Sequence, residues 1–348
     1  MKLASLKTGH PDGGLIVVAR DLRRAVSAAS VAPTLRAALD NWTFAAPALQ
    51  ALYDALNAGE ATDAFDFDAH ACAAPLPRTH QFIDASAFLN HGRIMTQAYH
   101  PEKKSDPSIP VLIQRQADDF AGPHDDYPFP DEADNCDFEG EVGVILGDVP
   151  MGVRAADALQ HVRLITLFND VSMRKHLFRE LGMGFGFVLA KPATAFAPVA
   201  VTPDELGDAW RDGRVQLDME ASRNGERFGA PNGCEMSFGF HELISYVAYN
   251  RNLRAGMLLG SGTFSNVDYR TTGSACLAEQ RAIEMLEYGE SRTPWLRFGE
   301  RLRFEMKGRD GQSVFGAIDH RFVQAPYVNS VNQVNQSATA EANAGASE

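Results

Sequence analysis

The sequence predicts an α+β protein in which strands outnumber helices, with a small α+β domain at the N-terminus. Most of the periodic segments are short β-forming runs bounded by glycine, proline, asparagine or aspartate. These strands do not alternate regularly with helices, which disfavours a Rossmann or TIM architecture. The length of 348 residues and the 45% hydrophobic content allow a sizeable core in one large or two smaller domains.

The N-terminal domain is predicted over residues 1–78. "MKLASLK" and "LIVVARD" flank "TGHPDGG", a pattern typical of a hairpin. Helices are predicted in "PTLRAALDNW" and in "APALQALYDALNAG", where Gly59 is suited to a C-cap. The acidic "EATDAFDFDAH" and the proline-flanked "APLPRTH" indicate a linker that ends near residue 79.

The second domain is predicted over residues 79–327, followed by a polar, disordered tail at 328–348. "VRLITLF" is typical of a buried strand, and "HELISYVAYN" of a helix with an apolar stripe. "VTPDELGDAW" predicts a helix, with Thr202 as its cap and Glu205 completing a capping box. "RVQLDMEASRNGERF" predicts a hairpin that turns at Asn224-Gly225, and "RLRFEMKGRDGQSVFGAIDHRFV" predicts another.

Composition excludes some partners. The net charge of −13 argues against nucleic acid, because phosphate binding depends on Lys and Arg. No apolar run approaches the roughly 20 residues of a membrane span, and the N-terminus lacks a signal-peptide core. The four cysteines form no C-x-x-C pair. We therefore expect a cytoplasmic protein with reduced thiols.

A row of acidic residues stands in the apolar stretch "DFEGEVGVILGDVP", residues 137–150. Asp137, Glu139 and Glu141 alternate, so in a strand all three would share one face. A divalent cation such as Mg²⁺ or Ca²⁺ would turn the repulsion between these carboxylates into attraction. The alternative is an edge strand with a solvated acidic face.

Two further stretches carry candidate site residues. Asp170 directly follows the strand "VRLITLFN" and could bind a ligand or cap the helix after it. "IDASAFLNH" contains Asp84 and, seven residues later, His91. By itself, such a histidine more often packs in a core than acts as a catalyst.

These stretches together resemble the fumarylacetoacetate hydrolase family. The resemblance rests on "DFEGEVGVI", "LFNDVSMR", "GFGFVLAKPAT", "GSGTFSN" and "CLAEQR", and extends over residues 79–325. "DASAFLNH" and the extra N-terminal domain resemble fumarylacetoacetases in their shorter bacterial form. The resemblance implies a roll of mixed β-sheets in a metal-dependent catalytic domain that is usually dimeric.

The resemblance also implies a set of site residues. The metal ligands, for Mg²⁺ or Ca²⁺, would be Asp84, Glu139, Glu141 and Asp170. His91 would be the general base, oriented by Glu279, with Lys191 beside the metal and Thr263 contacting the substrate.

Some positions depart from the family pattern in the region that would recognise the acyl group. They are Ser86, Ile113, Arg115, Gln116, Leu177 and Leu181. Arg115 could bind a substrate carboxylate. A surface arginine that offsets Asp118 and Asp119 is the favoured interpretation, because most charged side chains are exposed.

The implied reaction is metal-dependent hydrolysis of a carbon–carbon bond in a diketo acid. The implied substrate is 4-fumarylacetoacetate, cleaved to fumarate and acetoacetate in tyrosine and phenylalanine catabolism. A related hydratase, isomerase, decarboxylase or acylpyruvate hydrolase acting on another oxo acid is the alternative. A third possibility is a non-catalytic module in which a bound ion only stabilises the strands. The expected partners are a small-molecule substrate and a second copy of the chain, with neither nucleic acid nor membrane.

Overall fold

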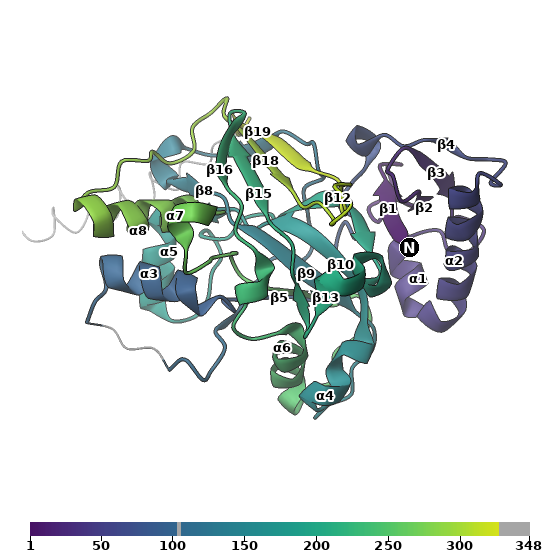
Figure 1. Cartoon of the computed structure of the whole chain (residues 1–348), viewed down its shortest axis with the longest axis horizontal. Helices are drawn as coiled ribbons and strands as arrows, with labels where there is room; N and C mark the ends of the chain where they lie inside the picture. Colours follow the sequence, from purple (N-terminus) through teal and green to yellow (C-terminus); the bar gives the residue numbers. More distant parts are fainter. Residues whose placement is uncertain (103–105, 327–348) are drawn as a thin grey trace, which may run out of the picture.

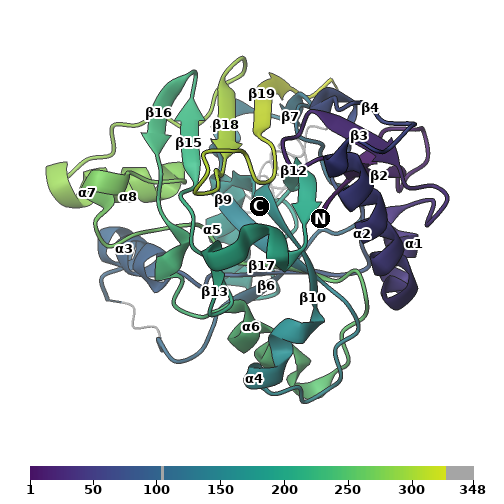
Figure 2. The same ribbon diagram turned by 45° about the vertical axis from the view of Figure 1, so that its right-hand side comes forward.

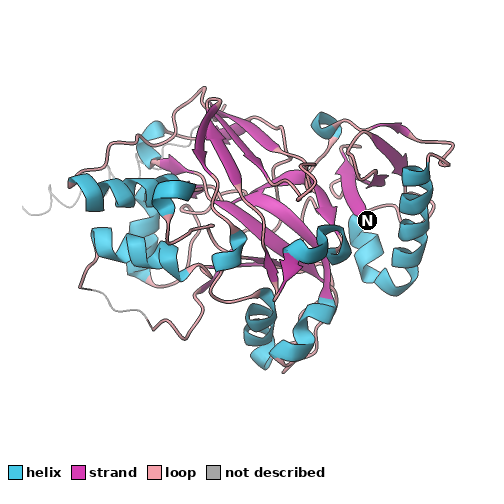
Figure 3. Cartoon of the chain, viewed as in Figure 1, coloured by secondary structure: helices cyan, strands magenta, loops and turns pink. Residues whose placement is uncertain are grey.

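The computed structural model describes residues 1–102 and 106–326. The predicted tail at 328–348 and the predicted domain end at 327 therefore lie outside the described residues. Within the described ranges the chain is an α+β structure dominated by strands, as the sequence predicts (Figure 3). No helix in these ranges is both long and apolar enough to cross a membrane.

Among the described residues, ten strands form one mixed sheet that runs through the molecule (Figure 1). β17 and β5 run parallel, and the other neighbouring strands are antiparallel. In sheet order the strands are β4 (Phe65–Asp66), β3 (Arg24–Ser27), β2 (Gly14–Val18), β1 (Lys2–Leu6), β12 (Ala195–Val201), β10 (Val162–Asn169), β9 (Gly140–Leu146), β17 (Leu258–Gly260), β5 (Phe82–Ala85) and β6 (Leu112–Arg115).

A second sheet of five described strands lies above the large sheet in the view of Figure 2. Its strands, in order, are β16 (Glu226–Gly229), β15 (Glu220–Arg223), β18 (Arg301–Glu305), β19 (Ile318–Gln324) and β7 (Tyr127–Phe129). Two short pairs complete the β-structure: β8 (Cys136–Asp137) with β11 (Ser172–Met173), and β13 (Trp210–Arg211) with β14 (Arg214–Val215).

The helices lie around the sheets in three groups (Figure 1). α1 (Leu35–Asp40) and α2 (Trp42–Ala58) pack on the N-terminal strands at the right. α3 (Leu89–Tyr99), α5 (Arg174–Met183), α7 (Tyr269–Thr272) and α8 (Leu277–Tyr288) gather at the left, and α4 (Ala155–Ala158) packs on α6 (Phe240–Val247) below. The left-hand group matters for function, because α3, α5 and α8 each carry a side chain of the site described below.

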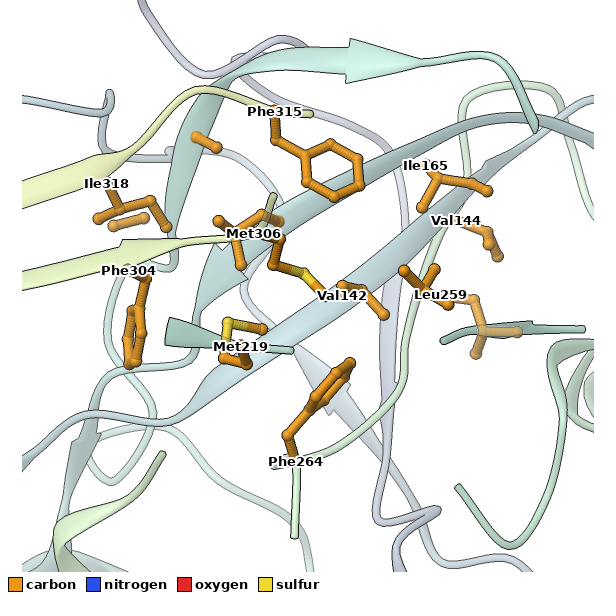
Figure 4. Packing of buried hydrophobic residues seen from close by; sticks show 14 of the residues in the cluster. Val142, Val144, Ile165, Met219, Leu259, Phe264, Phe304, Met306, Phe315 and Ile318 are labelled. Atoms are coloured by element: carbon orange, nitrogen blue, oxygen red, sulfur yellow. The ribbon is translucent and has the colours of Figure 1, made fainter. Parts of the chain in front are cut away.

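The main core fills the space between the two sheets (Figure 4). Val142 and Val144 alternate along β9 and pack toward Phe304 on β18 and Met306, which directly follows β18. Ile145, the residue after Val144 on β9, belongs instead to a second core on the opposite face. β9 is therefore apolar on both faces, which explains why its sequence "VGVIL" does not alternate with polar residues.

Most of the local predictions are confirmed. β1 pairs with β2 in the expected N-terminal hairpin. The helix that contains Pro47 ends at Gly59, which is left-handed as a C-cap glycine should be. β15 and β16 turn at Asn224 and Gly225, both with positive φ, as a type I′ turn requires.

One local prediction is wrong. Residues 203–209 form an irregular 3₁₀ segment instead of an α-helix, and the Thr202 side chain does not cap it. The Thr202 hydroxyl instead accepts a hydrogen bond from the amino group of Met1. The segment expected to be a linker contains a short strand, because Phe65–Asp66 forms β4 against β3.

The N-terminal segment shares the large sheet with the rest of the chain. β1 pairs with β12 at Lys2↔Val201 and Leu3↔Ala200. Leu3 and Val17 from this segment lie in the same buried cluster as Phe168 and Ile145. Residues 1–78 are thus joined to the following segment by main-chain pairing and by a common core.

Candidate active site

Several strands of the large sheet end at one place. β9 runs antiparallel to β10 and β17, so its first residues lie beside the last residues of both. β5 runs parallel to β17 and ends at the same edge. This topology brings together Asp84 on β5, Glu141 on β9 and Asp170, the residue directly after β10.

Asp84, Glu141 and Asp170 form what we call the carboxylate cluster. One oxygen atom from each residue lies within 4.8 Å of the other two, and all three residues are buried. Burial and the nearby charge of Asp170 raise the pKa of Asp84 to about 7. Burial, together with the charges of Asp84 and Asp170, raises the pKa of Glu141 well above its ordinary value. Ionisation of Asp84 and Glu141 is therefore disfavoured unless further positive charge is supplied.

The carboxylate cluster fits a hard divalent cation. Carboxylate oxygens are the ligands that Mg²⁺, Ca²⁺ and Mn²⁺ prefer. Within the described part of the chain, Oδ1 of the buried Asp84 has no hydrogen-bond partner. The backbone of β17 also leaves room for this oxygen, because a Cβ on Gly260 would lie only 2.1 Å from it. Asp84, Glu141 and Asp170 could thus hold such an ion.

The acidic row 137–141 is buried rather than solvated. Asp137, Glu139 and Glu141 are at most 4% exposed, and β9 lies in the interior of the sheet between β10 and β17. The edge-strand interpretation is therefore wrong. The three side chains have different partners: Glu141 joins the carboxylate cluster, whereas Asp137 and Glu139 bind Arg174.

Glu139, predicted as a metal ligand, lies outside the three-residue group and is held by cations. Arg174 donates from Nη2 to Oε1 of Glu139 at 2.6 Å, and Thr263 donates to the same oxygen at 2.9 Å. Lys191 donates to Oε2. Burial opposes ionisation of Glu139, but the charges of Arg174 and Lys191 outweigh it and hold its pKa well below the ordinary value.

Lys191 connects Glu139 to the carboxylate cluster, because its ammonium group also donates to Oδ2 of Asp170. Burial lowers the pKa of Lys191, but the charges of Asp170 and Glu139 outweigh this effect and hold the pKa above its usual value. The lysine is therefore a fixed cation between two buried carboxylates.

The charges of this buried network do not cancel. Its carboxylates outnumber its cations by five to three, so further positive charge would stabilise their ionised form. The members are Asp84, Asp137, Glu139, Glu141 and Asp170, with Arg115, Arg174 and Lys191.

His91 and Glu279 are in contact, as the sequence predicts. Nδ1 of His91 lies 2.8 Å from Oε2 of Glu279, and Ser274 donates to the other oxygen of Glu279 at 2.9 Å. His91 is in the first turn of α3 and Glu279 in the first turn of α8. A ring nitrogen of His91 also lies within 4.8 Å of a carboxylate oxygen of Glu139. Glu139 and Lys191 therefore link this pair to the carboxylate cluster.

Arg115 is buried, and its guanidinium contacts protein groups. Its side chain is 1% exposed, so the surface interpretation is wrong. Its guanidinium donates from Nε to Oδ1 of Asp170 at 2.8 Å and from Nη1 to the carbonyl of Lys191 at 2.8 Å. Nη2 donates to Asp170, Pro192 and Thr194. Because these donors face protein acceptors, the arrangement does not favour the predicted substrate contact.

Sequence reasoning missed Arg174 and did not find the partners of Asp137. Asp137 accepts hydrogen bonds from the backbone N–H groups of Leu277 and Ala278, in the first turn of α8, and so helps to place Glu279. The signal was available in part, because "NDVSMRKH" places Arg174 four residues after Asp170 and next to a buried strand. The pairing of Arg174 with Asp137 spans 37 residues and is visible only in the fold.

The chain is a strand-rich α+β protein that buries acidic side chains at one edge of its large sheet, where several strands begin or end. The model of the family described as fumarylacetoacetate (FAA) hydrolase C-terminal matches residues 81–323, and that of fumarylacetoacetase N-terminal domain 2 matches residues 1–78. The chain therefore belongs to the fumarylacetoacetate hydrolase family, which confirms the resemblance recognised in the sequence.

Curated relatives match the chain over part of its length. A 2,4-didehydro-3-deoxy-L-rhamnonate hydrolase of Sphingomonas sp. (strain SKA58) is 34% identical over 160 residues, which cover 45% of this chain and 53% of the relative. The human mitochondrial oxaloacetate tautomerase FAHD2B is 29% identical over 160 residues, covering 45% and 49%. The chain thus spans about half the length of the curated relatives that it matches.

Solved structures share the fold at low sequence identity. The maleylpyruvate hydrolase of Sphingobium sp. SYK-6, in complex with manganese(II) ion and pyruvate, has a TM-score of 0.61 and 16% identity, and the match covers 93% of this chain and 100% of that chain. The fumarylpyruvate hydrolase of Pseudomonas aeruginosa, in complex with Mn²⁺ and pyruvate, has a TM-score of 0.50 and 16% identity, covering 71% and 91%.

Proposed function

We propose that this chain is a divalent-cation-dependent enzyme that acts on a small oxo acid through the carboxylate cluster and the His91–Glu279 pair. The observation that carries the proposal is the position of Lys191 and Glu139. They connect three buried carboxylates suited to a cation with a histidine suited to proton transfer. The presence of Mn²⁺ in two related structures supports the choice of a divalent cation.

The proposed reaction is hydrolysis of a carbon–carbon bond in a diketo acid, with fumarylacetoacetate as the candidate substrate. A bound divalent cation would supply Lewis-acid polarisation of a substrate carbonyl. Glu279 fixes the His91 tautomer by accepting a hydrogen bond from Nδ1–H, which leaves Nε2 free to take a proton from water. The ammonium group of Lys191 would stabilise negative charge that develops on a nearby substrate oxygen.

Tautomerisation of an oxo acid is the second candidate function. It is favoured by the 29% identity to human oxaloacetate tautomerase FAHD2B over the shared segment. It needs the same cation and a proton-transferring group, but no attack by water on a carbonyl. Product analysis therefore distinguishes it from hydrolysis, because tautomerisation leaves every carbon–carbon bond intact.

The direct test is to incubate the pure protein with fumarylacetoacetate and follow the loss of its absorbance. We expect fumarate and acetoacetate as products, with turnover abolished by EDTA and restored by Mg²⁺ or Mn²⁺. Turnover of enol-oxaloacetate without cleavage, and none of fumarylacetoacetate, would favour the tautomerase. Lack of turnover of either compound, or of any acylpyruvate, in the presence of the metal would contradict both candidates.

A further inference from the structure

We propose that Arg115 sets the charge of the carboxylate cluster and thereby weakens and tunes its affinity for a divalent cation. This inference rests on the cation site of the proposed function. In this role Arg115 is a positioning residue that acts through Asp170 and does not touch the substrate.

The contacts of Arg115 fix its positive charge on one side of Asp170. Nε and Nη2 both donate to Oδ1 of Asp170, while Lys191 donates to Oδ2. Both oxygens of this predicted metal ligand therefore already accept hydrogen bonds from cations. Asp84, by contrast, has an oxygen without any hydrogen-bond partner in the described part of the chain. Asp170 is therefore the most strongly compensated carboxylate of the cluster.

The guanidinium is held in place by groups other than Asp170. The carbonyls of Lys191 and Pro192 accept from Nη1 at 2.8 Å and from Nη2 at 3.1 Å, and the Thr194 hydroxyl accepts from Nη2 at 2.9 Å. The central carbon of the guanidinium, Cζ, also lies 5.7 Å from the centre of the Phe82 ring. With these contacts Arg115 cannot easily swing away when a cation enters, so the ion would feel its repulsion in a poorly screened interior.

The position of Arg115 in the sheet ties it to the cluster. β6 pairs with β5 so that Arg115 lies opposite Phe82 and Ile113 lies opposite Asp84. Asp84 and Arg115 therefore belong to one strand pair, and Arg115 also binds the segment that carries Lys191. A change at this position alters the charge of the site while the strands that hold the other two carboxylates remain paired.

Calorimetric titration with Mn²⁺ at about pH 8 tests the inference. Arg115→Gln removes the charge but keeps an N–H donor, and we expect it to bind Mn²⁺ at least about tenfold more tightly than the wild type. Arg115→Lys keeps the charge and should bind within about threefold of the wild type. Arg301→Gln, which breaks an exposed pair with Asp319 in the other sheet, is the matched control and should bind as the wild type does.

A second measurement covers the case in which Arg115→Gln does not fold without metal. On protein purified with Mn²⁺, the variant should need a higher chelator concentration than the wild type to release the ion. A merely structural arginine would give the opposite result, because its loss would loosen the site and weaken binding. Equal or weaker Mn²⁺ binding by Arg115→Gln, or equal effects of the Gln and Lys variants, would overturn the role of Arg115. Failure of the wild type to bind Mn²⁺ would overturn the cation site as well.

Discussion

The buried carboxylates near the site fall into two sets. Asp137, Glu139 and Asp170 are each bound by a lysine or an arginine, whereas Asp84 and Glu141 have no such direct contact among the residues that the structure describes. An ionised carboxylate in a protein interior is costly unless it is paired or binds a metal. The contrast between these two sets of residues is what marks the carboxylate cluster as a site.

Lys191→Met should destabilise the protein strongly, because it leaves Glu139 and Asp170 without a shared cation. Removing one partner of a buried ion pair typically costs about 3–5 kcal/mol, and urea denaturation would measure the loss. Lys307→Met is the control, since Lys307 is 41% exposed where it meets Glu220, and exposed pairs contribute less than about 1 kcal/mol. Similar losses in the two variants would contradict the proposed role of Lys191 in the buried network.

Glu279→Gln should lower kcat much more than it raises KM, because the amide can no longer fix the His91 tautomer as a carboxylate does. Steady-state kinetics on the substrate that the protein turns over would show this. Glu284→Gln is the control on the same helix, since Glu284 accepts hydrogen bonds from Arg292 and Thr293 and does not contact His91. An unchanged kcat in Glu279→Gln would remove this residue from the mechanism.

Among the elements around the site, β17 contributes its backbone, which passes close to Asp84 at Gly260. Gly260→Ala should weaken Mn²⁺ binding, because the new Cβ would meet Oδ1 of Asp84 at 2.1 Å and push this carboxylate out of place. Calorimetry would measure the loss of affinity. Gly143→Ala on β9 is the control: the three atoms nearest its Cβ would belong to Phe168, Leu258 and Leu259, none of them a carboxylate, so it should lower stability without weakening binding. Wild-type affinity in Gly260→Ala would show that Asp84 is not a ligand.

Elements governed by local sequence could be predicted, whereas those governed by distant partners could not. The turn at Asn224-Gly225 depends on two residues that readily adopt positive φ, so its sequence is sufficient. The capping pattern at Thr202 failed because its hydroxyl binds the amino group of Met1, 201 residues away. β4 was missed for the same reason, since an acidic segment becomes a strand only when β3 is beside it.

The same distinction applies to the candidate site. The spacing of Glu139 and Glu141 indicated a shared face, but the fold directs their side chains to different partners. The position of Asp170 directly after an apolar strand indicated a ligand-binding group, whereas the role of Asp84 as a ligand came from the resemblance to a family. The positions of Arg115 and Arg174 followed from neither, because each binds carboxylates from strands far away in the sequence.

In the molecule as a whole, the two sheets share one main core, and ionisable groups that are not part of the site are also buried. His320 on β19 is fully buried, and Nδ1 lies 2.7 Å from the carbonyl oxygen of Asp125. Nε2 has no partner within the described ranges. The ring is therefore best accommodated as the neutral tautomer that donates from Nδ1, and a second proton would be buried without an acceptor.

His320 should consequently contribute a loss of stability in mild acid. Burial lowers the pKa of His320 below 6.5, and the nearby His124 adds to this effect, while the Asp125 carbonyl and the Asp319 charge oppose it. Below pH about 6.5 the unfolded chain binds a proton that the folded imidazole excludes, so the free energy of unfolding decreases as the pH falls.

Urea denaturation of His320→Gln would isolate this effect, since glutamine keeps an N–H donor for the Asp125 carbonyl but does not titrate. The loss of stability between pH 7.5 and pH 5.5 should be smaller in this variant than in the wild type. The exposed His10→Gln is the control and should retain the wild-type loss. Identical pH dependence in all three proteins would contradict a neutral His320 in the folded state.

The proposed function requires that a divalent cation binds to Asp84, Glu141 and Asp170. Crystals soaked in Mn²⁺ and measured for anomalous scattering test it most directly. We predict a peak within about 2.5 Å of a carboxylate oxygen from each of these three residues, the usual range for oxygen ligands. Glu141→Gln crystals treated in the same way should show a much weaker peak. A wild-type peak elsewhere, or its absence from the carboxylate cluster at saturating Mn²⁺, would contradict the account.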